Sequence, residues 1–191
     1  MLFFFIGYVP ERVVCVLPPG FSFDGRSAVI RSQQTHLTRA LCHAMMNTTN
    51  TTVCVLNAGA IRLDDELMGT ITQYDILRCL PYATNIVSLS VNGLILAKVL
   101  NRGLMNINTG MFISYAGVEY DAVAEKWFLQ SNRQPVDDEN LIITIVSIPY
   151  FIHNTELKQA SEDLVTYKTL TAAFIEYLEK AYAKTTHRSS S

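Results

Sequence analysis

A glycine turn that follows a short apolar run carries the residues best suited to binding chemistry in this sequence. Val53 to Leu56 is typical of a buried strand, and Asn57-Ala-Gly-Ala-Ile-Arg62 follows it directly. In α/β folds, glycine turns at the carboxyl ends of strands expose backbone amides to ligands, and Gly59 would let the main chain approach a bound group closely. The guanidinium of Arg62 offers a planar fork of N–H donors that suits phosphate or carboxylate. The spacing therefore predicts a candidate anion site.

A simpler interpretation of Arg62 is a surface ion pair with Asp64 or Asp65, which follow it closely in the sequence. The turn also lacks the G-x-x-x-x-G-K-[ST] spacing of a phosphate-binding loop and the lysine that would reach terminal phosphates. Composition and spacing leave both interpretations of Arg62 open.

Alternating helices and strands must position this turn. Apolar residues at helical spacing, capping residues and short β-rich runs mark the elements. The expected helices cover Thr35–Met46, Thr72–Cys79, Leu94–Leu100 and Leu164–Ala183. The expected strands cover Val53–Leu56, Ile86–Val91, Met111–Ala116 and Leu141–Ser147.

One of these strands has the pattern of a central strand. Leu141–Ser147 is apolar on both faces apart from Thr144, and strands covered on both faces show such continuous runs. We therefore expect the α+β class, with a mixed β-sheet packed by helices in one domain over residues 1–184 and a disordered tail over residues 185–191.

Length and composition limit the classes of protein that the chain can be. It has 191 residues, of which 49% are hydrophobic and 17% are charged, which suits one well-buried core. Lys plus Arg number 15 and Asp plus Glu number 17, giving a net charge of -2 without a block of like charge. This balance excludes a general nucleic-acid binder, and no segment has the ~20 apolar residues of a membrane span.

The N-terminus and the cysteines give limited information about the cellular compartment of the protein. Met1–Pro10 has no cationic lead and no small-x-small cleavage pattern, so we interpret it as a strand rather than a signal peptide. The localisation stays open, with the cytoplasm as the default. The four cysteines are widely spaced in apolar segments, which predicts buried free thiols.

Five short motifs follow one another along the chain: Asn57–Arg62, Gly69–Thr72, Leu80–Tyr82, Ile86–Val87 and Val91–Gly93. Their order and spacing resemble the C-terminal domain of the 5′-nucleotidase and UDP-sugar hydrolase family. That family shows a glycine-rich turn ending in Ile-Arg, a Gly-x-Ile-Thr helix start, a Leu-Pro-Phe, a strand, and a glycine that opens the next helix.

The similarity extends on both sides, over about residues 21–154. Upstream, Phe23-Asp-Gly-Arg26 and Arg31-Ser-Gln-Gln-Thr-His-Leu37 are similar to the opening of the domain and its first helix. Downstream, Thr109–Phe112 and Gly117–Asp121 are similar to the family's Gly-x-Phe hairpin. No single motif is specific, but their order in register is.

The resemblance implies a nucleotide-recognition role and suggests which residues would perform it. Arg62 matches the turn arginine that reaches phosphate, and Arg31 matches an arginine before the first helix that would join it. Asn57 matches the polar lead of the turn, where it would hold the loop or touch ligand. Tyr82 takes the position of an aromatic that stacks on the base, and Gly110 matches a glycine beside the ribose and base. With Gly59, these six form the expected substrate-binding set.

The family's catalytic machinery has no counterpart in this sequence. In the family, a separate N-terminal metallophosphoesterase domain holds two metal ions and the nucleophilic water. This chain has only four histidines and none of the Asp-x-His, Gly-Asn-His or Gly-His-x-His elements. We therefore expect no catalytic residues and no metal or cofactor in this chain. The expected partners are a weakly held nucleotide or nucleoside and a metallophosphoesterase domain acting in trans, with no nucleic acid.

Two departures from the family pattern support an alternative function. The family's Gly-Gly-Asp-Gly-aromatic loop, which supplies a second stacking ring, is replaced here by a segment that begins Pro149-Tyr-Phe. Tyr150 or Phe151 could substitute for that ring. Ala58 and Ala60 stand where the family has turn glycines, which narrows the approach of a ligand. The alternative is a non-catalytic interaction protein or a pseudoenzyme fragment that kept the fold but lost the ligand site.

Overall fold

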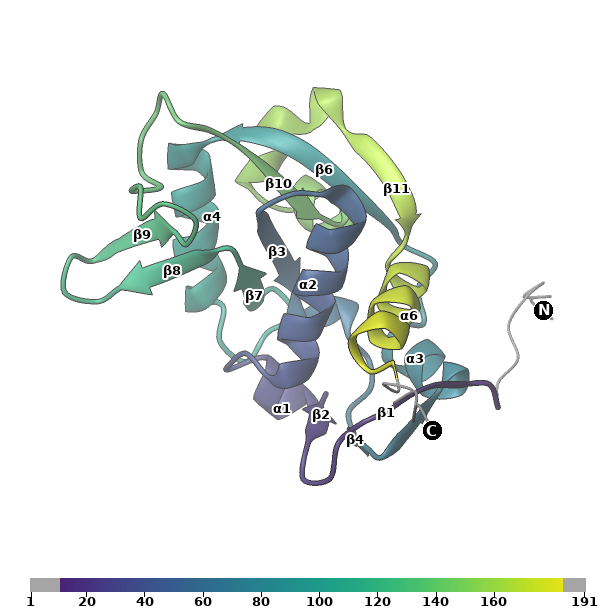
Figure 1. Cartoon of the computed structure of the whole chain (residues 1–191). Helices are drawn as coiled ribbons and strands as arrows, with labels where there is room; N and C mark the ends of the chain where they lie inside the picture. Colours follow the sequence, from purple (N-terminus) through teal and green to yellow (C-terminus); the bar gives the residue numbers. More distant parts are fainter. Residues whose placement is uncertain (1–10, 184–191) are drawn as a thin grey trace, which may run out of the picture.

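A five-stranded mixed sheet organises residues 11–183, the part of the chain that the computed structural model describes (Figure 1). The strand order is β11-β6-β10-β3-β7, and β10 pairs parallel with β3 while the other neighbours are antiparallel. The bounds are β3 Val53–Asn57, β6 Asn85–Asn92, β7 Ile113–Ala116, β10 Ile142–Ser147 and β11 Val165–Thr169. The expected α+β class and mixed sheet are confirmed. The proposed strand at residues 1–10 and the proposed tail lie outside the described residues.

The expected central strand is confirmed, because β10 lies in the middle of the sheet. Ile145 sits opposite Val53 of β3 on one side and Leu89 of β6 on the other. All three side chains are buried, but Ile142 is 64% exposed and Thr144 is also exposed, so both faces are covered only in the second half of the strand.

Helices cover both faces of the sheet. On one face, α2 (His36–Thr49) and α6 (Leu170–Ala181) lie side by side (Figure 1). On the other, α4 (Gly93–Met105), the short α5 (Pro149–His153) and the 3-10 segment η2 (Glu156–Asp163) pack together and against β6. The core between these layers is continuous and apolar.

Side-chain caps begin the main helices where the sequence places them. The hydroxyl of Thr35 accepts from the Thr38 N–H, and the Thr38 hydroxyl accepts in turn from the Thr35 N–H. Thr72 forms the equivalent capping box with Asp75 at α3 (Gln73–Cys79). The Asn92 side chain caps α4. Capping boxes satisfy N–H groups that have no partner within the helix, which explains why these boundaries were predictable.

Three smaller ladders surround the sheet. They pair β1 (Val13–Val16) with β5 (Thr70–Thr72), β2 (Ser22–Asp24) with β4 (Glu66–Met68), and β8 (Val118–Asp121) with β9 (Lys126–Leu129). The β8–β9 pair extends from the body as a hairpin (Figure 1).

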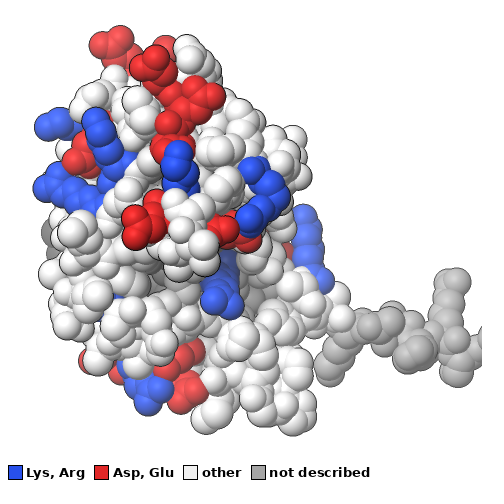
Figure 2. Space-filling model, turned by 90° about the vertical axis from the view of Figure 1, so that its left-hand side faces the viewer, with Lys and Arg blue, Asp and Glu red and all other residues white. Residues whose placement is uncertain are grey.

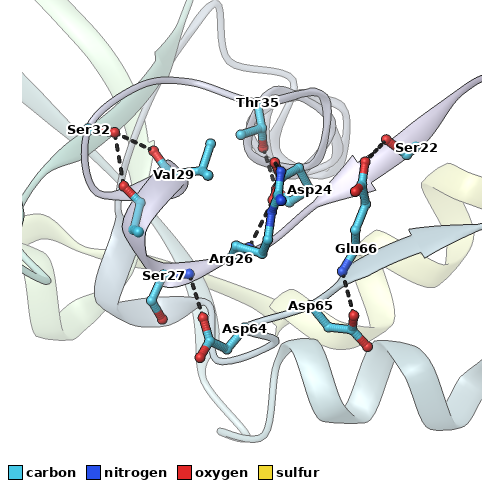
Figure 3. Close-up of polar contacts among 11 residues, drawn as sticks. Ser22, Asp24, Arg26, Ser27, Val29, Ser32, Thr35, Asp64, Asp65 and Glu66 are labelled. Carbon is cyan, nitrogen blue, oxygen red and sulfur yellow. Dashed lines mark hydrogen bonds and ion pairs between the residues drawn. The ribbon is translucent and has the colours of Figure 1, made fainter.

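Polar contacts join the segment before α2 to the segment that follows the glycine turn (Figure 3). The Thr35 hydroxyl donates to the Asp24 carbonyl over 2.8 Å, and Arg26 binds the Asp24 carboxylate. The backbone N–H of Ser27, which begins the short α1 (Ser27–Ile30), donates to Asp64 over 2.7 Å. Two segments distant in the sequence are thereby held side by side.

The prediction of one helix over residues 164–183 is wrong in its first part. Val165–Thr169 forms β11, and the helix starts only at Leu170. Residues 165–169 are rich in β-branched and aromatic side chains, and they pair antiparallel with the edge of β6. The Thr169 side chain then caps α6.

The backbone at Gly117 gives a testable prediction. Gly117 has φ +81°, and a Cβ there would lie 1.7 Å from the Thr52 carbonyl oxygen. Gly20 has nearly the same φ, +79°, with nothing within 4 Å of a Cβ. Gly20→Ala should therefore cost only the ~1–2 kcal/mol of a left-handed backbone. Gly117→Ala should cost at least ~2 kcal/mol more, because the chain must shift. Urea unfolding measures both, and equal losses would contradict the steric argument.

Candidate functional site

All six residues of the expected binding set lie on one cavity of about 620 Å³. Arg62 and Tyr82, which come from segments on either side of α3, line the same hollow. The expected residues on its wall are Arg31, Asn57, Gly59, Arg62, Tyr82 and Gly110. The tertiary structure thus brings together every residue that the sequence singled out for this site.

Two turns held against each other form one wall of the cavity. The Gly59 N–H and the Asn57 Nδ2 both donate to the Gly110 carbonyl, over 2.8 and 2.9 Å. A Cβ on Gly59 would lie 3.0 Å from that carbonyl oxygen. The sequence predicted that Gly59 permits a close approach to a ligand. What the structure shows is a close approach between the 3-10 turn η1 (Ala58–Ala60) and the turn at Gly110.

Two buried polar atoms on the cavity wall have no hydrogen-bond partner among the described residues. Asn57 is 2% exposed, and its Oδ1 is unpaired although its Nδ2 is bound. The Nε of Arg31 is likewise buried and unpaired. Most buried polar groups in proteins are paired, and an unpaired one costs ~1–3 kcal/mol. Both atoms are also closed off from solvent, so they are an unpaired acceptor and an unpaired donor within the cavity wall.

The simple interpretation of Arg62 as part of a surface ion pair is not what the structure shows. Asp64 accepts from the Ser27 N–H, and Asp65 is bound by Arg78 over 3.1 Å. Within residues 11–183 the Arg62 guanidinium has neither a hydrogen bond nor an ion pair. It is exposed on the cavity wall and keeps its donors for other partners.

Tyr150 is a second aromatic residue on the cavity. It lies in the first turn of α5, directly after Pro149, and is 60% exposed. Phe151, the other residue considered for this role, is 1% exposed and belongs to the core. Tyr82 is 51% exposed, and neither tyrosine contacts another ring within the described part of the chain. The cavity therefore offers two free aromatic rings.

The remaining lining residues were not predicted from the sequence. They are mainly apolar and come from the ends of elements: Ala60, Leu80, Thr84, Met111, Ile148 and Leu170. Only their position next to predicted residues or at strand and helix ends could have indicated them. With Arg31 and Arg62 as the charged lining residues, the described wall carries positive charge and no acidic group. Such a wall suits a molecule with a flat apolar part and an anionic end.

Other kinds of site are poorly supported in the described residues. No three His, Cys, Asp or Glu side chains within residues 11–183 are grouped so as to hold a metal ion. The four cysteines are free and buried, as predicted. Burial raises the pKa of Cys15 to about 11 and that of Cys79 to about 12, which disfavours the nucleophilic thiolate. None of the described helices combines the length and apolar character needed to cross a bilayer.

A match to a family model identifies the chain's family. The family model described as 5′-nucleotidase, C-terminal domain, matches residues 14–177. The chain therefore belongs to the 5′-nucleotidase C-terminal domain family, as the order of its motifs suggested. No curated protein matches it by sequence.

Solved structures of larger proteins share this fold. One is a 5′-nucleotidase precursor from Thermus thermophilus, with a TM-score of 0.75 and 21% identity over 90% of this chain. Another is the NAD nucleotidase of Haemophilus influenzae, with a TM-score of 0.72 and 20% identity over 91%. A third is a 5′-nucleotidase from Candida albicans, with a TM-score of 0.54 and 12% identity over 89%. The chain covers 37%, 36% and 39% of their respective lengths.

Asn57 provides a test of whether the site is maintained for stability or for binding. Asn57→Leu removes the unpaired Oδ1 and leaves the Gly110 carbonyl bound by the Gly59 N–H. The free energy of unfolding should change by less than ~1 kcal/mol, since replacing a half-paired buried amide by an apolar group of similar shape is nearly neutral.

Thr38→Val is the matched control for Asn57→Leu. Thr38 is also fully buried, but its hydroxyl is bound on both sides within the capping box. Its loss should destabilise the protein by ~1–2 kcal/mol in the same urea titration. If Asn57→Leu destabilises as much as Thr38→Val, then Asn57 serves the fold.

Proposed function

We propose that this domain recognises a nucleotide or nucleoside as the substrate-recognition part of a 5′-nucleotidase-type hydrolase. The reaction would be hydrolysis of the phosphate ester of nucleoside 5′-monophosphates or related nucleotides, with a dimetal domain supplied by another part or another chain. The observation that carries the proposal is that Arg31, Arg62 and Tyr82 share one cavity whose described lining contains no acidic side chain.

The unpaired guanidinium of Arg62 accounts for recognition of the phosphate. A guanidinium can donate two parallel N–H bonds to phosphate oxygens, and such charge-assisted bonds are about twice as strong as neutral ones. Arg31, with a buried and unpaired Nε, supplies a second set of donors on the same wall. Because no acid competes among the lining residues, both arginines favour an anionic ligand over its neutral counterpart.

The rings of Tyr82 and Tyr150 account for recognition of the base. Stacking needs only a flat π-face and contributes ~1–3 kcal/mol per base. Two half-exposed rings on one cavity could hold a base between them, so Tyr150 would take the place of the aromatic loop that this chain lacks.

In this proposal the chain binds and orients the substrate but does not carry out the hydrolysis. When bound in the other domain, the metal ions would supply the attacking hydroxide. The described residues of this chain contain no group of metal ligands, and their role is to hold the phosphate and the base at opposite ends of the cavity. A single open domain leaves its ligand partly in water, so we expect weak binding.

A non-catalytic interaction protein is the second candidate function. The exposure of Tyr82 and Tyr150, 51% and 60%, favours it, because open aromatic surfaces also suit protein partners. Titration of AMP and adenosine, followed by thermal stabilisation of the full chain, separates the two functions. Saturable stabilisation supports nucleotide recognition, and no stabilisation at millimolar ligand supports the interaction protein.

Arg62 and Tyr82 should affect different parts of the ligand. Tyr82→Ala should weaken the binding of AMP and of adenosine alike, by ~1–3 kcal/mol, because stacking does not depend on the phosphate. Arg62→Ala should weaken the binding of AMP by ~1.5–3 kcal/mol while leaving the binding of adenosine nearly unchanged. Isothermal titration calorimetry measures both. Equal losses of the two ligands in Arg62→Ala would contradict the assigned role.

Matched controls are available for both variants. Tyr74 is 56% exposed but lies on α3 beside Arg78, outside the cavity lining. Arg102 has a 67% exposed side chain paired with Glu156 and is also outside this lining. Tyr74→Ala and Arg102→Ala should leave both affinities unchanged.

Tyr150 tests the two-ring arrangement on its own. Tyr150→Ala should weaken adenosine by ~1–3 kcal/mol, and Tyr150→Phe should keep wild-type affinity because the π-face is retained. If Tyr150→Ala binds adenosine as tightly as the wild type, the base stacks on Tyr82 alone.

A further inference from the structure

A second hollow, of about 480 Å³, lies between α2 and the strands β7 and β8. It has no lining residue in common with the first cavity, so it is a separate feature of the surface. The face that carries the β8–β9 hairpin shows basic and acidic side chains interspersed above a recess at mid-height (Figure 2). The lining of the hollow is largely polar, with side chains from α2, β7 and β8.

Two side chains of α2 that carry N–H donors line this hollow. Arg39 and His43 lie four positions apart, a spacing that places side chains on the same face of a helix. Neither side chain has a hydrogen bond or an ion pair within residues 11–183. Their donors are therefore available on the wall of the hollow.

Arg39 is unusual because most arginines of the described chain are paired with acids. Five of the eight arginines within residues 11–183 form ion pairs: Arg12, Arg26, Arg78, Arg102 and Arg133. The other three line the two hollows: Arg31 and Arg62 the first, Arg39 the second. The same feature that supports an anionic ligand in the first cavity is thus present in the second.

The opposite wall of the second hollow adds neutral donors. The pKa of the Tyr115 phenol lies above its usual value. Burial raises this pKa by more than the charge of Arg39 and a hydrogen bond with Gln34 lower it. The phenol therefore stays protonated at neutral pH and lies close enough to Arg39 to be affected by its charge. The Tyr115 ring stands edge-on to Trp127 at 5.0 Å, which holds this wall in place.

One acidic side chain lines the hollow, and it is already paired. The Glu119 carboxylate forms an ion pair with Arg133, which also reaches Asp121. Arg133 is shared between Glu119 and Asp121, so it offsets only one of these two carboxylates, and neither of them pairs with Arg39. Arg39, His43 and the phenol of Tyr115 thus form a set of hydrogen-bond donors on the walls of the hollow to which no described carboxylate is bound.

We propose that this second hollow binds a small oxyanion, carried as a phosphate or a carboxylate group, between Arg39 and His43 on one side and Tyr115 on the other. The guanidinium supplies the charge-assisted bonds, and the imidazole and the phenol complete the set of donors. The site is independent of the nucleotide cavity and does not rest on the proposed function.

The test needs a readout at this site, since Arg31 and Arg62 could also attract phosphate. His43 provides it, because its imidazole resonances can be followed by NMR in the labelled full-length chain. The probes are inorganic phosphate and succinate, each titrated at constant pH and ionic strength against sodium chloride. We expect a saturable shift of His43 with at least one of the two anions. A response to phosphate alone indicates a phosphorylated ligand, and a response to succinate alone indicates a carboxylate.

Three variants complete the experiment. Arg39→Gln should lower the affinity for the anion, measured at His43, by at least ~tenfold, which is the loss expected for charge-assisted hydrogen bonds. Arg62→Gln should leave the His43 response unchanged, and Glu119→Gln should strengthen it by removing the one acid on the wall. Arg39 is exposed and unpaired in the described chain, so its replacement should not impair folding. No saturable shift of His43 with either anion, or the same affinity in Arg39→Gln, would overturn the proposal.

Discussion

The hydrogen bonds accepted by the main-chain carbonyl of Gly110 hold the candidate site together. This carbonyl accepts from the Gly59 N–H and from the Asn57 side chain, and so holds the turn after β3 against the turn before β7. β3 and β7 are neighbours in the sheet, and their pairing continues up to Asn57 opposite Ile113. The turns are therefore an extension of the sheet, and the cavity wall is as well defined as the strands that carry it.

The arginines of the described chain fall into two groups: those that form ion pairs with acidic side chains and those that do not. Surface ion pairs contribute little to stability, so the paired arginines say little about the fold. Their pairing is informative in another way, because it shows that an acid lies within reach of most guanidinium groups in the described chain. Arg31, Arg39 and Arg62 are the described exceptions, and each lines a hollow. A guanidinium without an internal counter-ion is free to bind an external anion.

Much of the fold was predictable because the signals for it are local. The apolar run of β10 identifies a central strand, and the Thr35 and Thr72 caps mark helix starts within a few residues. The glycine turn and its arginine could be found from spacing, whereas Arg31, Tyr82 and Gly110 required the resemblance to a family. The β1–β5 and β2–β4 ladders were missed, since their short strands pair with distant partners and carry little periodicity of their own.

The sequence by itself determined the class of fold, the main elements and the residues of one candidate site. The tertiary structure decided those features that depend on contacts between residues far apart in the sequence. Residues 165–169 are a strand because the edge of β6 is there to pair with them. Tyr150 lines the cavity while its neighbour Phe151 enters the core, because the direction in which α5 packs selects one ring for each side. The unpaired state of Arg62 and Arg39 likewise follows from where the acids of other segments lie, and no local pattern records that.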